Sequence, residues 1–145
     1  MPKGTMKAFL QKFHCSGYEN TETIEINYIF PNGINYTGTS RRCFLPNTKE
    51  GREILGLLKV AFERKLTFTI GTSVTTGVRN TTVWNGIHHK TSVSGGPTRF
   101  GYPDQTYFNR VKEELAAKGV KKENIKEDVQ SIASNMLYKN MVINS

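Results

Sequence analysis

Two short segments of this 145-residue chain combine glycine with side chains that donate and accept hydrogen bonds. Residues 71–77 read Gly-Thr-Ser-Val-Thr-Thr-Gly, and residues 84–91 read Trp-Asn-Gly-Ile-His-His-Lys-Thr. No Asp or Glu occurs from Leu66 to Pro103. Hydroxyls, imidazoles, a lysine and backbone amides near glycine are groups that hold phosphates and other anions. The two segments therefore predict a site for an anionic ligand.

The first segment sets hydroxyls between two glycines. Ser73, Thr75 and Thr76 lie between Gly71 and Gly77, so backbone amides and hydroxyls can approach a diphosphate closely. The spacing is neither that of a P-loop nor that of a dinucleotide fingerprint, so this segment taken by itself names no nucleotide family.

In the second segment, two histidines are adjacent. On an extended backbone His88 and His89 point in opposite directions, so one can enter a groove while the other supports the loop.

The net charge is +8, and the sequence pI is near 9.6. The lysines of the last 28 residues sit among Glu123, Glu127 and Asp128, and such a mixture of charges is typical of a solvated surface. In contrast, Arg79, Lys90 and Arg99 meet no carboxylate in their own segment. This imbalance favours an anion-binding role over incidental surface charge.

The composition, with 37% apolar residues and a mean hydropathy of −0.47, predicts one domain of common size. No apolar run is long enough to cross a bilayer, and the first residues lack the apolar core of a signal peptide, so we expect a cytoplasmic or nuclear location. Cys15 and Cys43 stand apart without metal-ligand spacing, which predicts buried free thiols and no metal.

The pattern of apolar residues predicts strands and helices in alternation. A period of two over 23–30, ended by Pro31-Asn32-Gly33, predicts a strand, and shorter strands are expected over 66–70 and 81–84. A cap at 47–50, with Glu50 three residues after Asn47, predicts a core helix through Phe62. The hydroxyl-rich turn and the histidine run thus follow neighbouring strands, where ligands commonly bind.

A second helix is predicted after Asp104, which is suited to be its N-cap, and Gly119 ends it. Glu114 lies at the flank of the apolar stripe, near Tyr107 and Val111. A carboxylate there is a candidate general base, and pairing with a surface lysine is the alternative. A last helix is predicted over 124–139, packed on the domain or, as a second choice, forming a dimer contact.

Several motifs in register resemble the Deltex carboxy-terminal domain. They are the 71–77 and 84–91 segments, Gly101-Tyr-Pro-Asp104 and Glu114-Leu115, preceded in the same order by 17–19, 31–34, 41–46 and 50–52. The resemblance covers residues 6–120 and leaves 121–145 as a C-terminal helical extension packed on the domain. The fold that it implies is a single α+β domain, with a twisted, mostly antiparallel sheet and helices packed on it.

The resemblance implies a module that binds ADP-ribose or NAD and recruits ADP-ribosylated proteins for ubiquitination. In the family this domain follows a RING, which recruits a ubiquitin-conjugating enzyme, and the two together can join ubiquitin to an ADP-ribose hydroxyl. Two cysteines are too few for a RING, so we do not expect full ligase activity from these residues.

By family position, His88 is expected to contact the ligand directly, and His89 to be structural or to support it. Trp84 is expected in the core rather than under the adenine, whereas Tyr102 is a candidate for stacking or for a ribose hydrogen bond. Glu114 is the candidate catalytic residue. The ligand-binding set expected from the motifs is Gly71, Thr72, Ser73, Thr75, Thr76, Gly77, Asn85, His88, His89, Lys90, Thr91 and Tyr102.

The chain departs from the family pattern at three places. Phe100 stands where many members have a histidine that works with the helix glutamate, and phenylalanine cannot take or give a proton. This puts ester formation, but not ligand binding, in doubt. Gly86 replaces a usual acid, which should make the rim more positive, and a proline-rich loop before Tyr36 is absent.

The sequence is compatible with three functions: a module that binds ADP-ribose, the catalytic half of a ligase that joins ubiquitin to ADP-ribose, and a basic nucleic-acid-binding domain. The third is the weakest primary role, because the sequence lacks the aromatic-plus-basic motif of single-strand readers.

Overall fold

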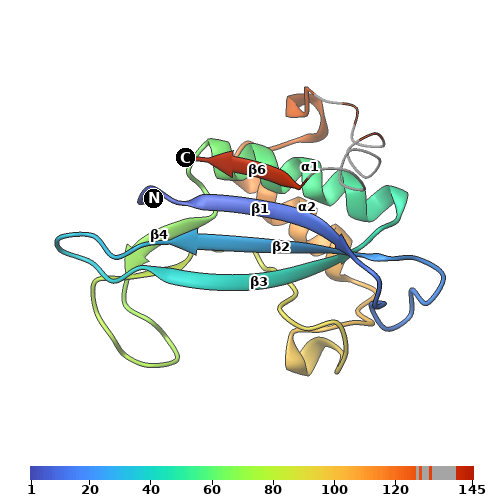
Figure 1. The fold of residues 1–145 in the computed structure, drawn as a ribbon, viewed down its shortest axis with the longest axis horizontal. Helices are drawn as coiled ribbons and strands as arrows, with labels where there is room; N and C mark the ends of the chain where they lie inside the picture. Colours follow the sequence, from blue (N-terminus) through green and yellow to red (C-terminus); the bar gives the residue numbers. More distant parts are fainter. Residues whose placement is uncertain (127, 129–130, 132–139) are drawn as a thin grey trace.

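Two antiparallel sheets and two principal helices make up the computed structural model, which describes residues 1–126, 128, 131 and 140–145. The larger sheet has the strand order β3-β2-β1-β6, and β4 pairs with β5 in a separate hairpin. Helices α1 and α2 lie together above and behind the sheet in the view of Figure 1. The predicted α+β fold with a mostly antiparallel sheet is confirmed. The element bounds are β1 Thr5–Gln11, β2 Thr23–Phe30, β3 Thr39–Pro46, α1 Lys49–Glu63, β4 Phe68–Gly71, β5 Thr81–Trp84, η1 Pro97–Arg99, α2 Tyr107–Ala117, η2 Lys122–Asn124 and β6 Met141–Asn144.

Strand β2 is the centre of the core. It spans the predicted residues, and its alternate side chains Ile24, Ile26, Tyr28 and Phe30 are buried. Their period of two sends them all to the sheet face that the helices cover, because successive strand residues point to opposite faces. The apolar pattern of this segment therefore sets both its conformation and its orientation.

Helix α1 begins one residue later than the cap pattern suggested. Thr48 is the N-cap, and its hydroxyl accepts the Gly51 N–H at 3.0 Å. Glu50 does not close a capping box on Asn47; it accepts a hydrogen bond from Lys112 of α2 at 3.2 Å. The apolar residues predicted to face the core, Ile54, Leu55, Leu58, Ala61 and Phe62, are all buried.

The β4–β5 hairpin is tied to the core by Trp84. Its ring stacks on Phe68 and on His89, with centroid distances of 4.4 Å in both pairs. This position agrees with the predicted core role of Trp84.

Helix α2 begins at Tyr107, and the prediction that Asp104 is its N-cap is wrong. Thr106 is the N-cap, and the Asp104 carboxylate accepts the Thr106 N–H at 3.1 Å before the helix starts. At the other end, Gly119 has a φ of 79°, which a residue with a side chain adopts only with strain, and the helix stops there as predicted.

The end of the chain adds a strand that the sequence pattern did not indicate. Strand β6 pairs antiparallel with β1, with Met6 opposite Ile143. The predicted helix over 124–139 falls mostly on residues outside those described. Cys15 and Cys43 are buried free thiols, as expected. Within the described ranges, no helix is long and apolar enough to cross a membrane, and no group of three metal-binding side chains occurs.

Candidate functional site

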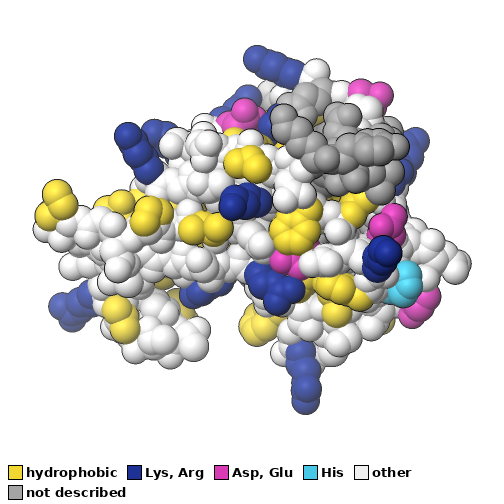
Figure 2. Space-filling view, in the orientation of Figure 1, with side chains coloured by type: hydrophobic (Ala, Val, Ile, Leu, Met, Phe, Trp, Pro, Cys, Tyr) yellow, Lys and Arg dark blue, Asp and Glu magenta, His cyan; other side chains and the backbone are white. Residues whose placement is uncertain are grey.

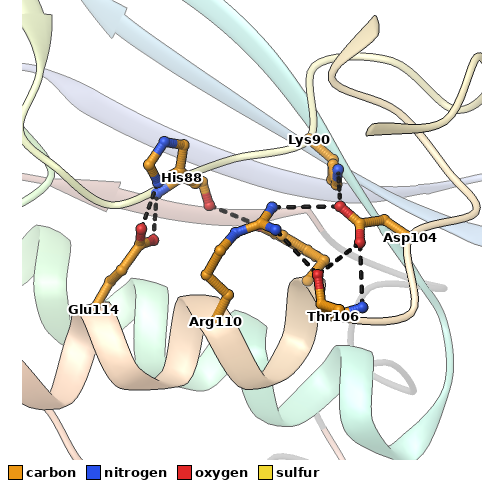
Figure 3. A network of polar contacts seen from close by, with 7 residues as sticks. His88, Lys90, Asp104, Thr106, Arg110 and Glu114 are labelled. Atoms are coloured by element: carbon orange, nitrogen blue, oxygen red, sulfur yellow. Dashed lines mark hydrogen bonds and ion pairs between the residues drawn. The ribbon is translucent and has the colours of Figure 1, made fainter. Parts of the chain in front are cut away.

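Glu114 of α2 holds His88 at two points. One carboxylate oxygen accepts the backbone N–H of His88 at 2.9 Å, and the other lies 2.5 Å from the ring Nδ1. A carboxylate can only accept, so Nδ1 carries the proton and Nε2 keeps its lone pair in the neutral ring. Figure 3 shows the second ring nitrogen pointing away from Glu114. The His88 side chain is 63% exposed, so an oriented imidazole with an acceptor nitrogen is presented to solvent.

The neighbouring His89 turns the other way, into the core. Its Nδ1 lies 2.8 Å from the Ile87 carbonyl and its Nε2 lies 2.9 Å from the Tyr28 hydroxyl. Burial lowers the pKa of His89 to about 4, so the ring is neutral near pH 7. Nδ1 therefore donates to the carbonyl, and Nε2 accepts from Tyr28. The prediction that the side chains of His88 and His89 point in opposite directions is therefore confirmed.

Lys90 is a buried ion-pair partner. Its ammonium lies 2.7 Å from Asp104, and both side chains are 4% exposed. Burial alone would raise the pKa of Asp104, but hydrogen bonds from Lys90 and Thr106 outweigh it and lower that pKa to about 2. Arg110 of α2 also reaches Asp104, at 3.3 Å, as Figure 3 shows. The charge of Lys90 is thus matched inside the protein.

Carboxylates outside the acid-free stretch of residues 66–103 therefore pair with its basic side chains. Glu114 faces His88, and Asp104 faces Lys90. The sequence expectation that Lys90 is an unbalanced cation is wrong, because it considered only carboxylates in the same segment.

Two other residues that were predicted to bind the ligand, Tyr102 and Asn85, make hydrogen bonds within the fold. Tyr102 is 1% exposed and its hydroxyl donates to the Phe44 carbonyl at 2.8 Å, so the ring offers no surface for stacking in this structure. The Asn85 side chain donates to the Leu66 carbonyl at 3.1 Å and so ties together the chain on either side of the hairpin.

The turn of residues 71–77 is exposed and bonded to itself. The Ser73 N–H donates to Val78, and the Gly77 N–H donates back to Ser73, both at 2.8 Å. The Thr76 and Val78 amides donate to the hydroxyls of Ser73 and Thr76, at 3.2 and 3.3 Å. These four bonds fix the shape of the turn and occupy three of its backbone donors and that of the next residue, Val78.

The turn and the histidine run lie at opposite ends of the hairpin. Gly71 pairs with Thr81 at one end, and Phe68 pairs with Trp84 at the other. The three residue steps of β5 separate these ends by about 10 Å. A ligand that touches both would have to be elongated and lie along β5.

A cavity of about 510 Å³ opens at the edge of β3, where sequence reasoning placed no ligand. In Figure 2 the surface is hollowed below β3, between the lobe of the β4–β5 loop and the lobe of residues 92–101. The one predicted residue that lines the cavity is Thr91. The sequence feature that could have pointed to the cavity is the pair of adjacent arginines, Arg41 and Arg42. The lining residues are Asn27, Tyr28, Ile29, Ser40, Arg41, Arg42 and Thr91.

Comparison with known proteins identifies a family and several relatives. The family model of the Deltex C-terminal domain matches residues 1–120. Probable E3 ubiquitin-protein ligase DTX3 of Homo sapiens is 52% identical over 113 residues, which cover 71% of this chain and 33% of that protein. E3 ubiquitin-protein ligase DTX1 of Homo sapiens is 45% identical over 131 residues, or 82% of this chain and 21% of that protein. E3 ubiquitin-protein ligase DTX4 of Mus musculus is 40% identical over 131 residues, with the same coverage. The match thus spans a third or less of each of these relatives.

Proposed function

Because the chain belongs to the Deltex C-terminal domain family, we propose that it binds ADP-ribose or NAD and recruits ADP-ribosylated proteins for ubiquitination. The relatives are named ubiquitin ligases, and the chain corresponds to a third or less of their length. Ubiquitin transfer would therefore require a RING domain and a ubiquitin-conjugating enzyme from elsewhere in a longer protein or from a partner.

The observation that carries the proposal is the oriented, exposed ring of His88. Glu114 fixes the ring, and its Nε2 is an acceptor that faces solvent. A ribose hydroxyl is a donor, so it is a natural partner for that nitrogen. A ring that is already fixed loses little conformational entropy when it binds.

The surroundings support an anionic ligand of elongated shape. The cavity beside β3 is lined by two arginines and no carboxylate, and the hydroxyl-rich turn lies at the far end of the hairpin from His88. A nucleotide diphosphate sugar has an anionic centre with a sugar on each side. Its length and charge suit a site that is extended in this way.

Titration calorimetry with ADP-ribose tests the proposal. We expect saturable binding that is tighter than that of AMP, because the second phosphate and the distal ribose add contacts. Comparable titrations with NAD would show which ligand is preferred. Heats that do not exceed those of dilution for both ligands would overturn the proposed function.

A catalytic role has one specific observation in its favour. Phe100 cannot act in proton transfer, but the carboxylate–imidazole pair of Glu114 and His88 can. Nε2 would take the proton of a ribose hydroxyl while its oxygen attacks the thioester carbonyl of ubiquitin and the thiolate of the conjugating enzyme leaves. This second function requires the first, since the hydroxyl belongs to the bound ligand.

A further inference from the structure

The C-terminal strand β6 covers one edge of the larger sheet and lies outside the part of the chain that the family model matches. That match ends at residue 120, whereas β6 is Met141–Asn144. Figure 1 shows β6 beside β1, and the strand order puts it at the margin of the sheet opposite β3. The outer edge of β1 without β6 would present a row of unpaired N–H and C=O groups, to which an extended segment can be added as a strand.

The register of β6 shows which side chains this edge accepts. Met6 lies opposite Ile143, and the next inward pair is Ala8 with Met141. Met6 and Ala8 are fully buried. Their partners on β6 point to the same face of the sheet and pack against the core. An added strand therefore needs apolar side chains at two positions that are separated by one residue.

Between these two positions, Lys7 lies opposite Val142 on the other face of the sheet. The Ser145 N–H donates to the Gly4 carbonyl at 3.0 Å, so those two residues form a hydrogen-bonded pair. Such pairs alternate along a ladder with non-hydrogen-bonded pairs, in which the side chains lie closer together. By this alternation Lys7 and Val142 form a close pair, although valine offers no acceptor to the ammonium.

Lys7 has no acidic partner among the residues that the structure describes. Glu25 lies on the same face, one position along from the residue of β2 that faces Lys7. Its carboxylate accepts hydrogen bonds from Arg42 and Gln11 instead. Opposite charges at facing positions stabilise a strand pair, and like charges destabilise it. The ammonium of Lys7 is thus available to a carboxylate at the place that Val142 occupies.

We propose that the outer edge of β1 binds an extended segment of a partner protein with the pattern apolar–acidic–apolar. The two apolar side chains of the partner take the places of Met141 and Ile143, and its carboxylate pairs with Lys7. β6 is an intramolecular occupant that lacks the charge pair, and the partner displaces it. This inference goes beyond the proposed function and does not depend on it, because none of the residues assigned to ADP-ribose belongs to β1 or β6.

Peptide binding to a chain with a detached β6 tests the proposal. Ile143→Asp sets a charge against the buried Met6 and should release β6 from the edge. Fluorescence anisotropy then compares two labelled peptides with the sequence of residues 140–145, an acidic one with Val142→Glu and a basic one with Val142→Lys. We expect the acidic peptide to bind about tenfold more tightly, because its charge attracts Lys7 where that of the other repels it. The ratio should shrink at high salt.

Two lysine variants of the Ile143→Asp chain serve as a matched pair. Lys7→Met should abolish the preference for the acidic peptide. Lys12→Met removes an exposed charge just beyond the end of β1 and should leave the preference unchanged. Equal affinity of the two peptides for the Ile143→Asp chain, or binding of neither, would overturn the proposal.

Amide hydrogen exchange in the full chain tests the same charge pair with β6 in place, and so also serves if Ile143→Asp fails to fold. The Met6 and Ala8 amides face β6 by the alternation of the ladder. Val142→Glu should slow their exchange, and Val142→Lys should accelerate it. Equal exchange in the two variants would contradict the pairing with Lys7. A wild-type dimer in sedimentation experiments that Ile143→Asp abolishes would assign the edge to a second copy of the chain and overturn the choice of a different partner.

Discussion

The carboxylate of Glu114 bonds both the backbone and the side chain of His88, at 2.9 and 2.5 Å. One acid on α2 thereby sets where the His88 backbone lies and which way its ring faces. Tyr107, about two helix turns before Glu114, adds a hydrogen bond from its hydroxyl to the His88 carbonyl at 2.8 Å. The exposed ring is thus held by a helix, although it belongs to a loop.

His88→Ala should weaken ADP-ribose binding by about tenfold, the value of one hydrogen bond to a ligand. Because the ring is largely exposed, the melting temperature should change little. Calorimetry and thermal unfolding measure the two effects. His14→Ala is the matched control, since that ring is also exposed and also makes a hydrogen bond through Nδ1, in its case to the Thr21 carbonyl. Equal affinity in the two variants would remove His88 from the ligand contacts.

Glu114→Ala should separate binding from transfer. We expect ADP-ribose affinity to be largely retained, because the ligand meets His88 rather than Glu114. Transfer of ubiquitin to ADP-ribose, measured with a RING domain and a loaded conjugating enzyme added, should fall by about a hundredfold, because the acid–base pair of His88 and Glu114 is broken. Glu113→Ala, one residue away on the same helix, is the control. Should affinity fall as far as transfer, Glu114 would be a binding group.

Ser73→Phe should abolish ADP-ribose binding by filling the space beside the turn, while the melting temperature stays nearly the same. Val74→Phe places an equal ring on the neighbouring, fully exposed position and should bind normally. Calorimetry of both variants is the measurement. Normal binding by Ser73→Phe would show that the turn does not border the ligand.

The buried pair of Lys90 and Asp104 should make the fold sensitive to strong acid. The pKa of Asp104 is lowered from 3.8 to about 2, so its stabilisation is complete above pH 4 and is lost as the pH falls toward 2. At about 1.4 kcal/mol per pKa unit, the loss is about 2 kcal/mol. Denaturant unfolding between pH 7 and pH 2 measures it.

Asp104→Asn should flatten that pH dependence and cost about 3 kcal/mol at pH 7, because Lys90 is left buried and unpaired. The double variant Asp104→Asn with Lys90→Met removes both charges and should recover part of this loss. A double variant no more stable than the single one would mean that the pair matters for packing rather than charge.

His89 should add a second loss of stability, at a less acidic pH than that of Asp104. Its pKa is lowered from 6.5 to about 4 by burial, so the neutral ring stabilises the fold fully above pH 6.5. That contribution is lost as the pH falls from 6.5 to 4, and amounts to about 3 kcal/mol. Unfolding in denaturant over this range should show a decline that His89→Gln lacks. A pH-independent wild type between 4 and 6.5 would contradict the burial of a neutral ring.

Much of the fold could be predicted because each strong signal was local. The alternation from Ile24 to Phe30 and the helical spacing from Ile54 to Phe62 are both visible within a single element. Strand β6 could not be predicted in this way, because Met141–Asn144 is short and becomes a strand only by pairing with β1, far away in the sequence.

For the candidate site, the sequence predicted which residues lie there better than it predicted what each of them does. His88 and His89 take opposite directions as a simple backbone argument requires. Lys90 was misjudged because its partner Asp104 lies 14 residues away and meets it only in the folded chain.

The pairing of β6 with β1 brings the two ends of the chain together. The Ser145 hydroxyl lies 2.8 Å from the Gly4 nitrogen, and Figure 1 shows the two termini close together, at the start of β1 and the end of β6. A polypeptide tethered to either end would therefore emerge at the β1–β6 side, across the sheet from β3. A bulky fusion at either terminus would leave the β3 margin unobstructed, and a short linker could ligate the ends into a circle.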